Sequence, residues 1–224
     1  MILIIKSPVN CLCDFTYNFF WQHQGSELDP NAPVEGQQES EYTYCDLVEH
    51  LRSGRDVHIK GNAGSRLASS LGVDLKYFGG NGRVLDVGSI FVDGNVGTRM
   101  GISMVSGRIY VSGSVAQPMG NVVEVVSDRE GYRCFRSITD ILHYDMGADE
   151  FTDSRNSYQD EDVPCLVLAD GVLRDTVGAR CERDVRVMVE GDVSLSTGIL
   201  MRKGIIIVEG NAGMNTGALL AGGT

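Results

Sequence analysis

A glycine that returns at a fixed spacing constrains this chain of 224 residues more than any other feature. Short runs rich in Val and Ile, such as IYVSG and IIVEG, each end at a glycine, and a second glycine follows seven residues later. Within a series, one run follows the previous one after 19 or 20 residues. Self-similarity at a fixed short period is typical of a repeat architecture. The glycines of the pattern are Gly94, Gly101, Gly113, Gly120, Gly171, Gly178, Gly191, Gly198, Gly210 and Gly217.

The runs before these glycines have the period of β-strands. Apolar residues alternate along each run, as at Ile90 and Val92 or at Ile206 and Val208, and strand side chains point to opposite faces in turn. A repeat this short buries its apolar residues only by stacking on copies of itself. We therefore expect an all-β fold, a right-handed parallel β-helix of about 19 residues per coil.

Two further expectations follow from stacked coils. The glycines would stand at corners, where a positive φ suits a residue without Cβ, and Asn95, Asp192 and Asn211 after them tolerate the left-handed region. The Met and Leu positions late in each repeat would line the interior: Met100, Met104, Leu200, Met201, Leu219 and Leu220.

The repeat divides the chain. Residues 1–56 lack it and are predicted to form an α/β capping segment, with a first strand at MILII and a helix over 43–53 that starts at Thr43. The β-helix domain would span 57–224, interrupted at 127–165 by an acidic insertion with a short helix near 137–143. The end after Gly223 would expose unpaired strand edges, which must be covered by the insertion, a second copy or a different subunit.

Composition excludes several classes of function. The net charge of −11 argues against nucleic acid and anionic membrane surfaces as partners. No apolar run approaches the roughly 20 residues that span a bilayer, and the N-terminus lacks the features of a signal peptide. We expect a cytoplasmic protein.

The sequence carries no catalytic constellation. There is no G-x-S-x-G elbow and no phosphate-binding loop, and the four histidines show no ligand spacing. Of the six cysteines, Cys11 and Cys13 alone are close in sequence, and C-x-C is not the usual C-x-x-C pairing of metal sites. They are weak metal candidates, and buried reduced thiols are the favoured interpretation. We predict no catalytic residue, no cofactor-binding residue and no cofactor.

The runs GNVGTRMGISMVSGRIYVSGSV and GNAGMNTGALLAGG resemble the GXGXG-domain family over about residues 57–126 and 166–224. That family includes the β-helical subunit of formylmethanofuran dehydrogenase, an enzyme of methanogenesis, and the C-terminal β-helix domain of the glutamate synthase large subunit. The corner from Met104 to Gly107 looks more like the dehydrogenase subunit.

The resemblance implies a non-catalytic scaffold subunit of an archaeal-type oxidoreductase complex of redox or C1 metabolism. It would pack against catalytic subunits, form a homo-oligomer, or do both. One alternative is a stand-alone β-helix domain of an archaeal-type glutamate synthase. Another is an enzyme with an unrecognised site at the insertion or at the Cys11/Cys13 segment.

Overall fold

The structure is a computed structural model that describes residues 1–16, 29–75, 80–144, 150–160 and 162–224. Parts of the predicted capping segment and of the predicted insertion therefore lie outside the described residues. Within the described residues the strands are β1 (Ile2–Ile5), β2 (Gln37–Gln38), β3 (Val57–Lys60), β4 (Ile90–Asp93), β5 (Arg108–Val111), β6 (Val122–Val125), β7 (Arg133–Ser137), β8 (Ser157–Gln159), β9 (Cys165–Leu168), β10 (Arg186–Val189) and β11 (Ile205–Val208). The helices are α1 (Tyr44–Arg52) and α2 (Ile138–Tyr144).

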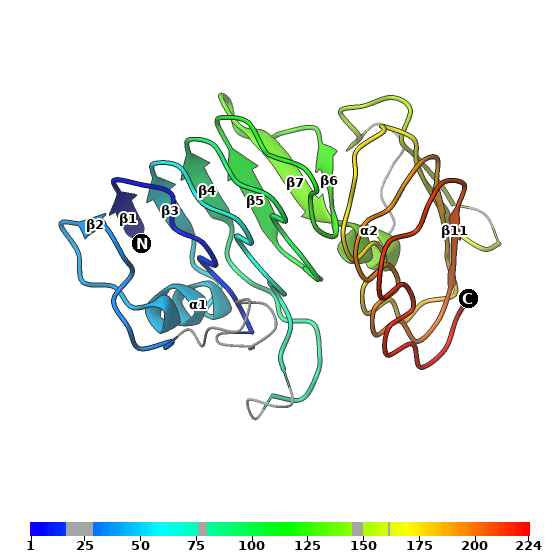
Figure 1. The fold of residues 1–224 in the computed structure, drawn as a ribbon, viewed down its shortest axis with the longest axis horizontal. Helices are drawn as coiled ribbons and strands as arrows, with labels where there is room; N and C mark the ends of the chain where they lie inside the picture. The colour runs from blue at the N-terminus through cyan, green and yellow to red at the C-terminus, as the bar shows by residue number, and fades with distance from the viewer. Residues whose placement is uncertain (17–28, 76–79, 145–149, 161) are drawn as a thin grey trace.

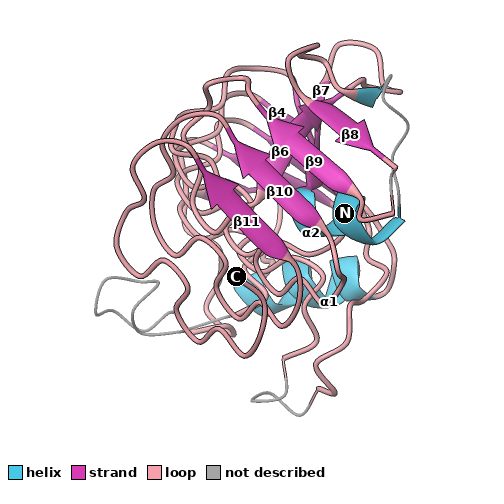
Figure 2. Cartoon of the chain, turned by 90° about the vertical axis from the view of Figure 1, so that its right-hand side faces the viewer, coloured by secondary structure: helices cyan, strands magenta, loops and turns pink. Residues whose placement is uncertain are grey.

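These strands form two mixed sheets. The first has the order β2-β1-β3-β4-β5-β7-β6 and the second the order β11-β10-β9-β8. Strands β1, β3, β4 and β5 are parallel neighbours, as are β9, β10 and β11. Figure 1 shows the two sheets as separate stacks with α2 between them, and Figure 2 shows β9, β10 and β11 side by side.

The predicted fold class, an all-β right-handed parallel β-helix, is wrong. The structure is mixed α/β, with two helices among the described residues and antiparallel pairs in both sheets. The decisive strand is β7, which lies antiparallel between β5 and β6 and occupies the edge of β5 where another parallel strand would pair. Since β7 comes from the insertion and has no glycine repeat, the period could not reveal it.

Several local predictions are confirmed. The helix predicted over 43–53 is α1, and Thr43 caps it by accepting a hydrogen bond from the Asp46 amide at 3.1 Å. The carboxylate of Asp46 accepts from the Thr43 amide in return, which completes a capping box. The MILII segment forms β1, and the helix predicted near 137–143 is α2.

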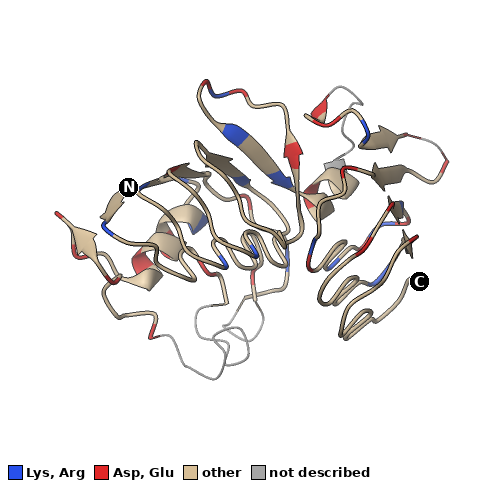
Figure 3. Cartoon of the chain, turned by 45° about the horizontal axis from the view of Figure 1, so that its top comes forward, with Lys and Arg blue, Asp and Glu red and all other residues tan. Residues whose placement is uncertain are grey.

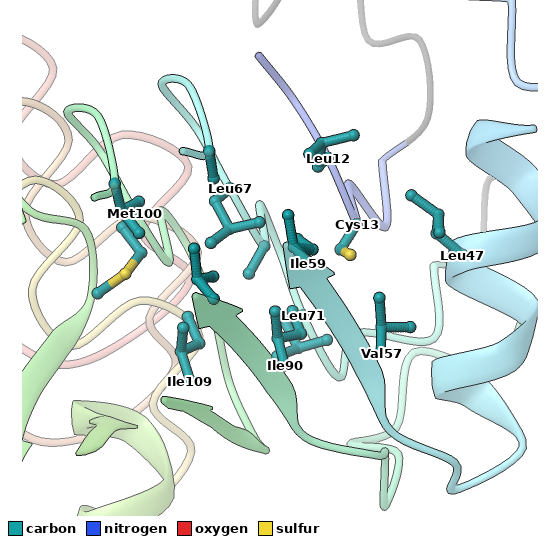
Figure 4. Packing of buried hydrophobic residues seen from close by; sticks show 14 of the residues in the cluster. Leu12, Cys13, Leu47, Val57, Ile59, Leu67, Leu71, Ile90, Met100 and Ile109 are labelled. Atoms are coloured by element: carbon teal, nitrogen blue, oxygen red, sulfur yellow. The ribbon is translucent and has the colours of Figure 1, made fainter. Parts of the chain in front are cut away.

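Each sheet covers its own apolar core. In the first core the side chains of Ile59, Ile90 and Ile109 lie on neighbouring strands beneath Met100, all fully buried (Figure 4). The second core is built on Val187 and neighbouring strand residues and includes Met201. Parallel register puts like residues opposite each other, as with Val187 and Ile206, so each core continues along its stack.

Two buried polar side chains connect the sheets. Asn121 donates from Nδ2 to the Met104 carbonyl and to Thr139 Oγ1, both at 2.8 Å, and its Oδ1 accepts from the Gly178 amide at 2.9 Å. Arg174 donates from Nε to the Val122 carbonyl at 2.9 Å. These bonds link the end of the first stack to α2 and to the start of the second stack.

Arg174 is 2% exposed and depends on Asp170 for its charge balance. Its Nη1 donates to Asp170 Oδ1 at 2.8 Å, and Asn156 donates to Oδ2 of the same carboxylate. Burial by itself raises the pKa of Asp170, but the hydrogen bonds and charge of Arg174, with the bond from Asn156, outweigh it and hold that pKa below its ordinary value. The ionised carboxylate is therefore more stable in the folded chain than in the unfolded one.

We expect Asp170→Asn to lower the free energy of unfolding at pH 7 by about 2 kcal/mol, since a charged hydrogen bond inside the protein is lost. A depressed folded-state pKa gives stability that is complete above the unfolded value of about 3.9 and is lost as the pH falls through the folded value. The difference between wild type and variant should therefore shrink below about pH 4. Urea unfolding at several pH values measures it, with Asp184→Asn, from the exposed pair with Lys203, as a control of little effect. A difference that stays constant at every acidic pH would contradict the assigned role of the carboxylate.

The ten pattern glycines fall into two groups. Six have a positive φ, between +68° and +127°: Gly101, Gly171, Gly178, Gly191, Gly198 and Gly217. The other four, Gly94, Gly113, Gly120 and Gly210, do not, and there a Cβ would collide with the neighbouring turn; for Gly94 and Gly113 it would lie 2.6 Å from the carbonyl oxygens of Gly61 and Gly94. These four positions need glycine because the backbones of adjacent turns approach closely.

The Asn and Asp residues after the glycines connect adjacent turns. Asn95 Oδ1 accepts from the amide of Ser114, and Asp192 Oδ1 accepts from the amide of Asn211, each 19 residues further along the chain. None of Asn95, Asp192 and Asn211 has a positive φ. Asn95 and Asp192 therefore act through a side-chain hydrogen bond to the next turn, and the predicted left-handed backbone at these positions is wrong.

Candidate functional site: an exposed apolar surface on the second sheet

Cys11 and Cys13, the predicted weak metal candidates, lie buried after β1. Burial, helped by the carboxylate of Asp14, raises the pKa of Cys11 to about 11, and the same two causes raise the pKa of Cys13 further. These shifts disfavour the thiolate, which is the form that acts as a nucleophile. This argues against a nucleophilic cysteine at the Cys11/Cys13 segment.

The remaining cysteines and the described histidines, His50, His58 and His143, do not converge on a site, and His23 lies outside the described residues. All six cysteines lie among the described residues and none forms a disulfide. Among those residues, no group of three or more His, Cys, Asp or Glu side chains is placed to hold a metal ion. His58 stacks on Phe91 with ring centroids 4.5 Å apart, and Phe91 stacks on Tyr110 at 4.6 Å. His58 thus belongs to an aromatic ladder across β3, β4 and β5.

The described part of the insertion adds a strand to each sheet and the helix that lies between them (Figure 1). It supplies β7, α2 and β8, and Thr139 donates to the Ala179 carbonyl at 2.6 Å. Among its charged side chains, Arg136 pairs with Asp140 at 2.7 Å, and Arg155 pairs with Asp153 at 2.6 Å. Because each carboxylate is paired with an arginine, Asp140 and Asp153 have structural roles. They do not form a pair of carboxylates suited to acid–base catalysis.

The most unusual surface lies on β11 and the turns after it. Among the described residues, five of the nine large apolar side chains that are exposed fall in 205–224, although this segment is a small part of the chain. Ile205 and Ile207 are each 40% exposed, and Met214 is 73% exposed. We call this the β11 surface, and it consists of Ile205, Ile207, Met214, Leu219 and Leu220.

Ile205 and Ile207 face away from the core, because they alternate along β11 with Ile206 and Val208. The position of β11 explains the exposure of the interior positions and of the turns that follow. It is the last strand of the second sheet and pairs with β10 on one side, while among the described residues no strand pairs with its other side. The interior positions of the repeat, which are buried in β10 at Val187, are therefore half-exposed in β11 at Ile206. The prediction that Leu219 and Leu220 line the interior is wrong, because no further turn of the described chain covers them.

Leu200 lies half-buried, whereas Met100, Met104 and Met201 are buried as predicted. The sequence signal for the β11 surface was the exposed strand edge expected near Gly223. The alternation of Ile206 and Val208 already puts Ile205 and Ile207 on the opposite strand face, and the register with β10 agrees with it.

Charged residues border the β11 surface, with Arg186, Arg202 and Lys203 at the start of β10 and β11 and acidic residues at their ends. Glu190, Asp192 and Glu209 are exposed in the turns that follow β10 and β11, and Figure 3 marks acidic residues in red at the turns of the second sheet. Exposed apolar surface with a charged border is the usual anatomy of a protein–protein interface. The β11 surface therefore has the chemistry of a docking site for another protein.

Comparison with known proteins identifies an archaeal relative. The chain is 52% identical over 197 residues to an uncharacterized protein of Methanothermobacter thermautotrophicus. The match covers 88% of this chain, and the chain spans about 61% of the length of that relative. No family model matches the chain, and no solved structure matches it. Among the described residues, no helix has the length and apolar character needed to cross a membrane.

Proposed function

We propose that this chain is a non-catalytic structural subunit that packs, through the β11 surface, against a catalytic subunit of a larger redox or C1-metabolism complex. The observation that carries the proposal is the exposed apolar strand face at Ile205 and Ile207. The type of complex rests on the GXGXG-domain resemblance and remains a prediction from the sequence. Cysteines that stay reduced fit the cytoplasm as its location.

A different protein fits the β11 surface better than a second copy of this chain. A symmetric dimer would place the same patch against itself and would bring together two chains that each carry a net charge of −11. Like charges facing each other across an interface are unfavourable. We therefore expect a partner with a basic border around its own apolar patch.

Purification from the source organism under native conditions tests the proposal. The tagged wild-type chain should co-purify with a partner. The amount of partner that co-purifies with Ile207→Lys should be at least about tenfold lower, because the lysine charge would be desolvated in an apolar contact. Ile2→Lys is the matched control, since Ile2 is also a strand isoleucine and is 51% exposed. Both variants should keep the stability of the wild type to within about 0.5 kcal/mol.

The identity of the partner decides the rest of the proposal. A molybdopterin-containing protein would support the dehydrogenase type of complex, and an amidotransferase with a flavoprotein would support the glutamate synthase type instead. A monomer that turns over a substrate alone, or equal retention of the partner by Ile207→Lys and Ile2→Lys, would contradict the scaffold function through this surface.

A further inference from the structure

A cavity of about 500 Å³ lies between the two halves of the molecule, on the side of α2. One wall is the loop that connects β3 to β4, in which Val73 and Val84 form an antiparallel bridge. The opposite wall consists of successive turns of the second stack, which contribute Arg180, Leu200 and Leu219. A volume of this size lies within the range of roughly 300–1,000 Å³ that is typical of small-molecule sites.

The carboxylates that line the cavity already have partners. Asp74 accepts from Arg52 Nη2 at 2.9 Å and from the Asn81 amide at 2.8 Å. Glu182 pairs with Arg202 at 3.0 Å. Negative charge at the cavity wall is therefore largely balanced by these groups.

Two side-chain nitrogen atoms at the same cavity have no hydrogen-bond partner among the described residues. Arg180 Nε and His143 Nε2 are buried and make no hydrogen bond with any described residue. Burial is the largest cause that lowers the pKa of the Arg180 guanidinium, and the neighbouring charge of Arg202 adds to it. A buried donor without an acceptor costs free energy, and a guanidinium offers a rigid fork that matches carboxylate and phosphate oxygens.

Most of the remaining lining is apolar and lies beside these donors, and Arg83 adds one exposed cation. Arg180, Leu200 and Leu219 occupy equivalent places in three successive turns, because the Arg180 amide donates to the Ile199 carbonyl and the Leu200 amide donates to the Ala218 carbonyl. All three residues have φ between +55° and +58°. Val84 and Val105 add apolar surface to the cavity.

We propose that this cavity binds a small organic anion, a carboxylate or phosphate group carried on an apolar body, with Arg180 as the residue that binds the anionic group. His143 Nε2 provides a second hydrogen-bonding group, and Leu200 and Leu219 contact the apolar body. Anion binding in the cavity is separate from docking of a protein on the β11 surface, which shares only Leu219 with the cavity. The isolated chain should therefore bind the anion without a protein partner.

Calorimetric titration of the purified chain with hexanoate and with hexyl phosphate tests the site, and hexylammonium serves as the cationic control. We expect saturable binding of at least one anion at millimolar concentration and none of hexylammonium. Arg180→Gln should weaken the binding by at least about tenfold, since it removes a charged hydrogen-bonding partner. Lys203→Gln removes the same charge from a neighbouring exposed position that does not line the cavity, and should leave the affinity within about twofold.

The tighter of the two anions identifies the anionic group. Since Arg180 Nε has no partner to lose, Arg180→Gln should melt at the wild-type temperature, which separates a lost site from a lost fold. Failure of both anions to bind the wild type, equal weakening by Arg180→Gln and Lys203→Gln, or equal binding of hexylammonium would each overturn the proposal.

Discussion

Replacement of Asn121 by Ala should lower the free energy of unfolding by about 4 kcal/mol, because a buried amide N–H would be left without a partner and a cavity would remain. Asn121 is fully buried, and its side chain bonds to Met104, Thr139 and Gly178, which belong to the first stack, α2 and the second stack. The Met104 carbonyl and Thr139 Oγ1 each keep another partner, in Ser137 and Ala179. The Gly178 amide has no replacement for the lost acceptor.

Urea unfolding measures this loss, and Asn95→Ala is the matched control. Asn95 also accepts two hydrogen bonds, from Ser114 N and Oγ, but it is exposed to solvent that can replace them. We expect Asn95→Ala to cost about 1 kcal/mol or less. Amide exchange at Gly178 should accelerate only in the Asn121 variant. Equal losses for the two variants would show that Asn121 does not join the two stacks.

Replacement of Gly101 by Val should also destabilise the chain by about 4 kcal/mol, from a strained left-handed backbone and an overpacked core. Gly101 has φ +70°, and a Cβ at this position would overlap Cγ1 of Val122, which is fully buried in β6. The clash would separate β6 from the turn that follows β4. For a chain of this size the melting temperature should fall by about 8 °C or more.

Gly171→Val separates the two causes of that loss. Gly171 has a similar φ of +72°, but no atom lies within 4 Å of the place that its Cβ would take, so this variant carries the backbone strain without the clash. We expect it to cost about 1–2 kcal/mol. A melting temperature for Gly101→Val that equals that of Gly171→Val would contradict the close packing of β6 on the first stack.

The local structure could be read from the sequence because its causes are local. Alternating apolar residues fix the strands at Ile90–Asp93 and Ile205–Val208, and the Thr43–Asp46 capping box fixes the start of α1. Glycine was required at all ten pattern positions, by a positive φ at six of them and by close backbone contact at the other four. The period alone could not separate these two reasons, because both disfavour a Cβ.

The candidate sites were much less predictable. Leu220 takes the place in its turn that Met201 takes in the preceding one, yet Met201 is buried and Leu220 is exposed, since β11 lies at the edge of the sheet. Arg180 and His143 are separated along the chain and show no ligand spacing. They line one cavity because α2 packs against the turns of the second stack.

Where the strands, turns and helices form is thus encoded locally, because hydrophobic period, capping residues and glycine act over a few neighbouring residues. How those strands pair depends on contacts between distant segments. The edge of β5 is taken by β7 from the insertion, and this pairing replaces a continuous parallel stack with two mixed sheets. An unpaired strand edge can accept any strand whose backbone reaches it, so the pairing depends on which segment packs there. A repeat period carries no information about a segment that lies outside the repeat.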